Sequence, residues 1–285
     1  MVDLRYWLAL HSVEGIGPSL FHSLIEKYGE PEEVFHAPLH DLLEIPRLTE
    51  EKAKRIHEIA DMMEEIENLL LSLDDQKVKI LTMRDEDYPE VLKEMKNPPP
   101  LLYLYGNMKI EDQNAVAIVG TRNPSEEGYQ RAKEFAQGLV EAGFTIVSGY
   151  ADGIDTAGHL GAVENDGRTI MVLSFGINHF QLKEGLKSLE FIYERGVILS
   201  EFFPSVPFSV GRAMERNRLV CGLSRAILVV EAGLTGGTLH TAEEALKMKK
   251  PLFVYQDTAI RGNAELIRKG AKGVKSFKEL IGKLQ

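Results

Sequence analysis

The spacing of apolar residues changes character near residue 75. Between Leu4 and Leu73, apolar side chains recur three or four positions apart, which is the spacing of amphipathic helices. The longest apolar stripe predicts one helix of about four or five turns, and it consists of Ile56, Ile59, Met63, Ile66, Leu69 and Leu70. The pattern predicts a small all-helical domain over residues 1–75.

After residue 113, short β-rich runs alternate with amphipathic segments. The expected strands are 115–119, 145–148, 169–173, 197–200, 226–230 and 251–255, after two short ones at 79–83 and 101–105. The expected helices are 129–142, 155–165, 184–194, 212–223 and 238–247. Short buried strands joined by helical crossovers indicate a parallel sheet covered on both faces. We therefore expect an extended Rossmann-like, mostly parallel α/β domain over residues 76–285.

Composition is that of a globular protein, but the charge is unevenly spread. The 285 residues are 44% hydrophobic and 27% charged, with a formal net charge of −10, which excludes disordered and collagen-like chains. Residues 1–110 hold 22 acidic and 12 basic residues, whereas residues 111–285 hold 21 of each. The negative charge therefore belongs to the helical segment and does not argue against an anion site in the second domain.

Cysteine content and hydropathy indicate the compartment. Cys221 is the single cysteine, so an intramolecular disulfide or a thiolate metal cluster is excluded, and a reducing compartment fits. The first residues do not resemble a secretory signal, and no apolar run reaches membrane-spanning length. We expect a cytoplasmic protein with no membrane association, no metal and no cofactor.

Three turns at predicted strand ends have the chemistry of an anion site. Gly120-Thr121-Arg122 follows the first strand of the second domain, Ser148-Gly149 ends the next, and Gly236-Gly237-Thr238 opens a later helix. Glycines let the backbone approach a phosphate, helix N-termini supply N–H donors, and arginine provides a planar cation. Because parallel strands end at one edge of the sheet, these turns predict a composite phosphate-binding crevice.

Asp155 and His159 lie four positions apart at the start of a predicted helix. Asp155 is placed to cap that helix, and His159 shares its face. No nucleophile motif accompanies them, so we interpret the pair as support for the site rather than as catalytic groups.

Arg216-Asn217-Arg218 provides further cations within a predicted helix. Residues two apart on a helix diverge, so one arginine can contact a phosphate while the other forms an ion pair with Glu215 or Glu231.

Taken in order, these motifs resemble the DNA-processing protein A (DprA, also called Smf) family. The matching segments are 118–122, 147–149, 153–155, 157–159, 199–201, 216–218, 222–224, 229–232, 236–238, 241–242, 262–263 and 266–271. The resemblance implies a non-enzymatic protein that binds single-stranded DNA as a homodimer and helps load RecA during DNA uptake and recombination (natural transformation). It also implies that Arg122 is the leading phosphate contact and that a family lysine corresponds to Lys183.

Two features depart from that family or stand apart from it. Asp152 occupies a position where members of the family usually carry a basic residue. In the helical domain, 13–18 resembles the hairpin of helix-hairpin-helix modules, and 43–49 resembles a second copy without its glycines. Because the segment is acidic, we favour an interaction module similar to a sterile-alpha-motif domain over a phosphate-binding one.

Two alternatives use the same crevice. Residues 235–238 with Glu243 and Glu244 loosely resemble the motif of nucleoside-monophosphate phosphoribohydrolases, which would make the protein an enzyme. Alternatively, the crevice is a nucleotide-binding site in which Asp152 hydrogen-bonds a ribose.

Overall fold

The computed structural model describes residues 3–257 and 260–284, and the chain divides into two compact units, Met1–Tyr103 and Leu104–Gln285. The sequence pattern instead suggested a division after residue 75. The intervening segment contains β1 (Val78–Thr82), α7 (Glu90–Lys93) and the first part of β2 (Leu101–Gly106).

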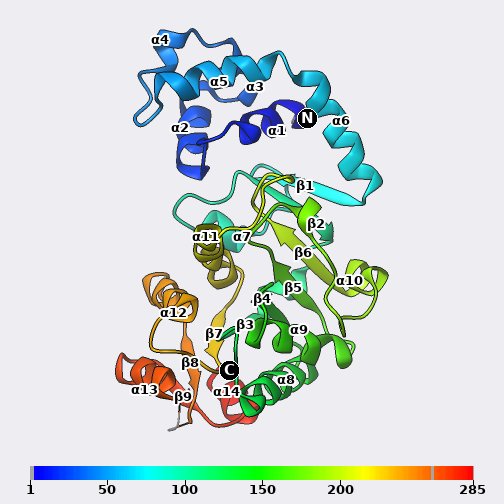
Figure 1. Cartoon of the computed structure of the whole chain (residues 1–285), viewed down its shortest axis with the longest axis vertical. Coiled ribbons are helices and arrows are strands. Elements are labelled where there is room, and N and C mark those ends of the chain that lie inside the picture. Colours follow the sequence, from blue (N-terminus) through cyan, green and yellow to red (C-terminus); the bar gives the residue numbers. More distant parts are fainter. Residues whose placement is uncertain (1–2, 258–259, 285) are drawn as a thin grey trace. The chain divides into compact units, whose positions relative to one another are not determined.

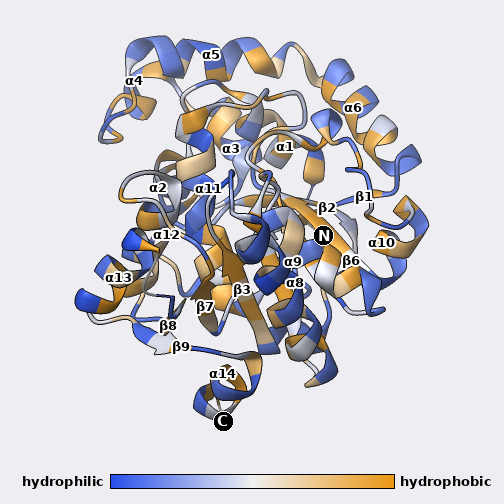
Figure 2. Cartoon of the chain, turned by 60° about the horizontal axis from the view of Figure 1, so that its bottom comes forward, coloured by the Kyte–Doolittle hydropathy of each residue, from blue (hydrophilic) through white to orange (hydrophobic). Residues whose placement is uncertain are grey.

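Helices dominate the first unit. They are α1 (Leu4–Ser12), α2 (Pro18–Tyr28), α3 (Pro31–His36), α4 (Leu39–Leu42), α5 (Glu50–Ala60) and α6 (Met63–Asp75). Trp7 and Phe21 are fully buried and pack with ring centroids 5.4 Å apart. Much of α4 and α5 has hydrophilic colours in Figure 2, as expected for helices that bury one face.

The expected single helix through Ile56 and Leu70 is wrong, because α5 ends at Ala60 and α6 begins at Met63. Met62 leaves the helical region, with φ −106° and ψ 23°. Its N–H bonds to the carbonyl of Ile59, three residues back, which closes a tight turn. Ile56 in α5 and Ile66 in α6 are both buried, so apolar residues recur at helical spacing on both sides of the break. Periodicity alone therefore does not reveal that the helix is interrupted.

The second unit is a parallel sheet with helical crossovers, which confirms the expected fold class. Its strands are β3 (Ala115–Val119), β4 (Thr145–Gly149), β5 (Thr169–Val172), β6 (Gly196–Ser200), β7 (Ala226–Val229), β8 (Leu252–Tyr255) and β9 (Lys272–Val274). They lie in the order β6-β5-β4-β3-β7-β8-β9, and each neighbouring pair is parallel.

The helices of this unit follow the predicted alternation in part. They are α8 (Glu126–Glu141), α9 (Ile154–Glu164), α10 (Leu189–Arg195), α11 (Val210–Gly222), α12 (Gly237–Lys247), α13 (Arg261–Arg268) and α14 (Phe277–Leu284), with short 3-10 helices η1 (Ile110–Asn114) and η2 (Ile177–His179). The pattern missed β9, α13 and α14. It also placed the start of α10 five residues early, because 184–188 is a loop that ends at the N-cap Ser188.

The sheet is covered on both faces (Figure 1). Alternate residues of β3, such as Val116 and Ile118, join a core with residues of α8, α9 and α14, whereas α11 and α12 pack elsewhere on the sheet and on each other. Helices α8 and α9 approach closely because Gly161 has no side chain. A Cβ there would lie 2.5 Å from the carbonyl oxygen of Lys133. Figure 2 shows β3 as a hydrophobic strand within these layers.

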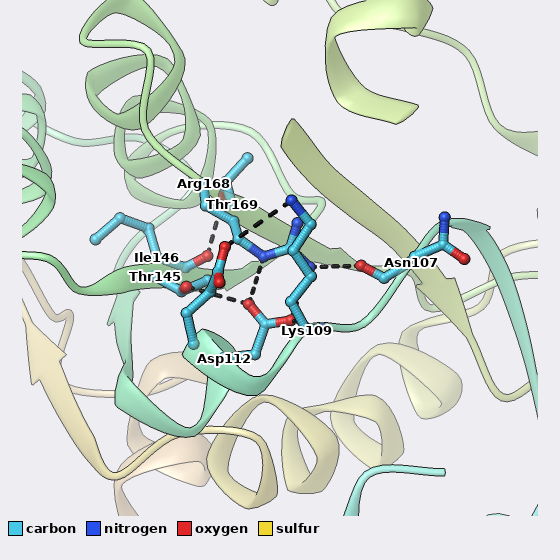
Figure 3. A network of polar contacts seen from close by, with 8 residues as sticks. Asn107, Lys109, Asp112, Thr145, Ile146, Arg168 and Thr169 are labelled. Atoms are coloured by element: carbon cyan, nitrogen blue, oxygen red, sulfur yellow. Dashed lines mark hydrogen bonds and ion pairs between the residues drawn. The ribbon is translucent and has the colours of Figure 1, made fainter. Parts of the chain in front are cut away.

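At the amino ends of the strands, Arg168 and Asp112 form a buried ion pair (Figure 3). Arg168 donates to both oxygens of Asp112, at 2.6 and 2.7 Å, and to the carbonyl of Asn107 at 2.6 Å. Thr145 donates to the same carboxylate at 3.1 Å. This network fixes η1 against the starts of β4 and β5.

The strand order reverses at β3, which has β4 on one side and β7 on the other. In open α/β sheets, ligands bind outside the carboxyl ends of the strands at such a switch point. In residues 3–257 and 260–284, no helix combines the length and apolar character needed to cross a membrane.

Candidate functional site

The turns that follow β3, β4 and β7 converge on one cavity of about 510 Å³. Of the residues singled out from the sequence, its lining includes Gly120, Thr121, Arg122, Gly149, Asp155, Arg216, Asn217, Gly236, Gly237 and Thr238. The cavity lies at the switch point of the sheet, so the structure brings most of the expected site residues together.

Gly120 and Thr121 join the turns to one another. The Thr121 N–H donates to the carbonyl of Glu231 at 2.8 Å, and the Thr121 carbonyl accepts from the N–H of Ile154 at 3.2 Å. A Cβ on Gly120 would lie 2.5 Å from the Ile154 side chain. These two residues therefore hold the site together, while the exposed Arg122 provides its charge.

The N-terminus of α8 is occupied by the protein itself. Ser125 Oγ accepts from the Gly128 N–H at 3.0 Å and donates to Glu231 Oε2 at 2.8 Å. The Ser125 N–H also donates to this carboxylate, at 3.1 Å. Because the Glu231 carboxylate fills the place of an anion here, this helix end is not open to a ligand, contrary to the sequence-based expectation for the first turn. Glu231 is therefore a structural partner of Ser125 at the start of α8.

The N-termini of α9 and α12 are different. Both helices begin after glycines in the left-handed region, Gly153 with φ 79° and Gly236 with φ 112°, and among the described residues neither has a side-chain cap. Asp155 lies within the first turn of α9, so the expectation that it caps this helix is wrong. Gly236 and Gly237 are exposed, and Thr238 is buried at the cavity. Uncapped N–H groups and a positive helix end make α12 the open anion-binding position.

Gly149 lets two opposite charges approach each other. A Cβ there would lie 2.4 Å from Nη2 of Arg216 and 2.5 Å from Oδ2 of Asp155. Arg216 is only 4% exposed, donates through Nη1 to the carbonyl of Val172, and contacts Asn217 Oδ1 at 3.2 Å. Burial raises the pKa of Asp155, and the charge of Arg216 opposes that shift. Burial likewise lowers the pKa of Arg216.

His159 and Ser148 lie beneath the cavity. Burial lowers the pKa of His159 to about 4, so at neutral pH its ring is uncharged. Nε2–H then donates to the carbonyl of Gly149 at 2.7 Å, and Nδ1 accepts from the hydroxyl of Thr169 at 2.7 Å. Ser148 is buried and donates to the carbonyl of Ile118 at 2.6 Å. Both residues position the end of β4 and are not among those lining the cavity.

Arg218 points away from the cavity. It forms an ion pair with the buried Glu201, rather than with Glu215 or Glu231 as expected for the second arginine. Burial raises the pKa of Glu201 to about 7, which the charge of Arg218 opposes. The two arginines diverge on α11 as their spacing predicts, and of this pair only Arg216 lines the cavity.

A second cavity of about 540 Å³ adjoins the first, and the two share Arg122, Ala151 and Arg216. Its lining includes Lys183, together with Tyr150 and Phe208, which the sequence pattern did not identify. Phe208 is 50% exposed, and the Arg122 guanidinium lies 5.7 Å from its ring centroid. Phe208 follows Pro204 and Pro207 in a segment without helical or strand periodicity, so no pattern distinguished it from an ordinary loop residue.

Asp152 lies at this second cavity and is paired with Lys183. Lys183 Nζ donates to Asp152 Oδ1 at 2.8 Å and to Thr156 Oγ1 at 3.0 Å. This hydrogen bond lowers the pKa of Asp152, so its carboxylate is ionised at neutral pH.

The acids of the enzymatic alternative lie elsewhere. Glu244 pairs with Lys247 at 2.6 Å, and neither Glu243 nor Glu244 is among the residues lining the two cavities. Among the described residues, no group of three or more His, Cys, Asp or Glu side chains is placed to hold a metal ion.

Comparison with known proteins gives two family matches. The sequence profile of the DNA recombination-mediator protein A family matches residues 79–285, and that of a SAM-like helix-hairpin-helix tandem matches residues 8–61. Protein Smf of Synechocystis is 33% identical over 293 residues, which cover 99% of this chain and 73% of that protein. DNA processing protein DprA of Streptococcus pneumoniae is 33% identical over 225 residues, covering 78% and 79%.

Solved structures give the same picture. The X-ray structure of DprA from Streptococcus pneumoniae aligns with a TM-score of 0.82 at 29% identity, covering 99% of this chain and 98% of that one. A structure of DprA from Helicobacter pylori, described for its single-stranded DNA binding mode, aligns with a TM-score of 0.64 at 32% identity, covering 72% and 95%.

Proposed function

This chain belongs to the DNA recombination-mediator protein A family, and on that premise we propose that it binds single-stranded DNA through the two adjoining cavities. We further propose that it acts as a cytoplasmic homodimer that assists RecA loading in DNA uptake and recombination, without catalysing a reaction. The observation that carries the DNA-binding proposal is the convergence of Arg122, Arg216 and the open end of α12 on one cavity at the switch point.

A phosphodiester in the first cavity would meet complementary groups on several sides. The N–H groups at Gly237 and Thr238 and the positive end of α12 favour an anion, and Arg122 supplies an exposed cation. Asn217 lies at the same wall. These groups contact phosphate rather than base edges, so binding should be independent of sequence.

The second cavity adds a place for bases. Phe208 offers a half-exposed ring beside Arg122, and the ring of Tyr150 lies below Lys183. Aromatic surfaces beside cations are the usual means of binding single strands, whose unpaired bases can stack. Duplex DNA keeps its bases stacked inside, so we expect a preference for single strands.

A titration resolved by length and salt tests this function. Fluorescence anisotropy with labelled oligo-dT should show binding that weakens steeply as salt rises, with a weaker signal for the matching duplex. The same protein incubated with AMP should release no adenine and should bind AMP more weakly than the oligonucleotide in calorimetry. Absence of oligonucleotide binding by folded protein would overturn the proposal, and tight AMP binding would favour the nucleotide-binding alternative.

A further inference from the structure

The ammonium group of Lys183 is held in place at the second cavity. Its Nζ donates to Asp152 and Thr156, and it lies 4.7 Å from the centroid of the Tyr150 ring. The Lys183 N–H donates to the hydroxyl oxygen of Tyr150 at 2.9 Å, and that hydroxyl donates to the carbonyl of Gln181 at 2.9 Å. Thr156, Tyr150 and Gln181 hold Lys183 in position and carry no formal charge. Asp152 is therefore the negatively charged partner of the lysine.

Asp152 approaches this lysine from the solvent side. The side chain of Asp152 is 84% exposed, whereas that of Lys183 is 23% exposed. Arg122 also favours the ionised carboxylate, although less than Lys183 does. The carboxylate therefore lies in the field of two of the cations that line the second cavity.

The contact between the Asp152 carboxylate and the Lys183 ammonium resembles the contact that a phosphodiester would make with this lysine. Exposed ion pairs contribute little net stability, and the Asp152 side chain is exposed enough to turn into solvent. A phosphate can therefore replace it on Lys183, but only in competition with it.

We propose that Asp152 is an affinity-determining residue that occupies Lys183 as an internal anion and gives way when single-stranded DNA binds. This inference rests on the proposed function and deepens it. Its consequence is that the protein binds DNA more weakly than its cations would allow, and that longer strands, which bring several phosphates at once, displace the carboxylate best.

Removing the charge of Asp152 while keeping its shape tests the inference. Asp152→Asn retains an oxygen that can accept from Lys183, so the lysine stays in position. We expect oligo-dT binding to tighten about two- to fivefold, the range spanned by exposed ion pairs. We also expect the salt dependence to steepen by about 0.7 in log–log slope. In the wild type, the displaced Asp152 carboxylate takes up a counterion and offsets the one that the phosphate releases, whereas the Asp152→Asn variant takes up none.

Asp166→Asn is the matched control. Asp166 pairs with Lys187 at 2.5 Å and is 73% exposed, and neither residue is among those lining the two cavities. Its φ of 54° is one that Asn tolerates well. This variant changes net charge by the same amount, so unchanged affinity is expected, and equal tightening in both variants would overturn the inference.

A double-mutant cycle completes the test. In a Lys183→Met background, Asp152→Asn should give much less tightening than it gives in the wild type. If wild-type protein binds oligo-dT but Asp152→Asn does not tighten binding, this inference fails and the proposed function stands. If folded wild-type protein does not bind, both fail together.

Discussion

The N-termini of α8 and α12 are preceded by similar turns but differ in what contacts them. Helix α8 follows β3, where the strand order reverses, α12 follows the neighbouring β7, and each is preceded by a turn that contains glycine. At α8, Ser125 and the Glu231 carboxylate occupy the first turn, whereas the N-cap of α12 is Gly236, and no side chain among the described residues caps this helix. One helix end is satisfied by the protein, and the other is available to a ligand.

A charged group or a helix N-terminus is available to a ligand only where no group of the protein already contacts it. Glu231, His159 and the Arg218–Glu201 pair have their partners inside the protein. Arg122 is exposed at a cavity with the open end of α12. We therefore expect substitutions in the first group to alter stability and substitutions at the cavity to alter binding.

The largest effect is expected from His159. Its pKa in the folded state is lowered to about 4, below that of the unfolded chain, so its stabilising contribution is present above pH 6.5 and is lost as the pH falls towards 4. The loss should reach about 3 kcal/mol. Urea unfolding of the wild type and of His159→Gln across this range should show the stability gap between them shrinking by that amount. A difference in unfolding free energy that does not change with pH would show that His159 does not stabilise the fold through its buried, uncharged ring.

Glu231→Ala should give the next largest effect. The variant loses the acceptor of Ser125 and the negative charge at the start of α8, which should cost about 1–2 kcal/mol of unfolding free energy. Affinity for oligo-dT should be unchanged under conditions where the variant is folded. Markedly weaker binding would mean that the two helix ends are not functionally separate.

Phe208→Ala should have the smallest effect. Loss of one stacking surface should weaken oligo-dT binding by about 1 kcal/mol and leave the melting temperature unchanged, because half of the ring is exposed. A Phe202→Leu variant is the control. Phe202 is not among the residues lining either cavity, so its substitution should leave oligo-dT affinity unchanged. Equal affinity of Phe208→Ala and the wild type would exclude base stacking at this position.

The sequence predicted the sheet and the convergence of its turns, because buried β-runs, glycines and helical spacing are local features. It did not predict the partners of the charged side chains. The partner of Arg218 is Glu201 rather than Glu215 or Glu231, and the partner of Asp152 is Lys183, 31 residues away along the chain. Such pairings depend on the distances between loops, which no local pattern encodes. The break between α5 and α6 was not predicted because the helical spacing of apolar residues continues in the sequence from Ile56 to Leu70.

The open N-terminus of α12 and Arg122 are expected to form a ligand site rather than a structural one. Arg122→Ala should weaken oligo-dT binding by about tenfold or more, since a charge-assisted contact is lost, while its melting temperature matches that of the wild type. Glu231→Ala, measured beside it, should show the reverse pattern. Unchanged affinity of folded Arg122→Ala, measured by anisotropy at low salt, would contradict the account.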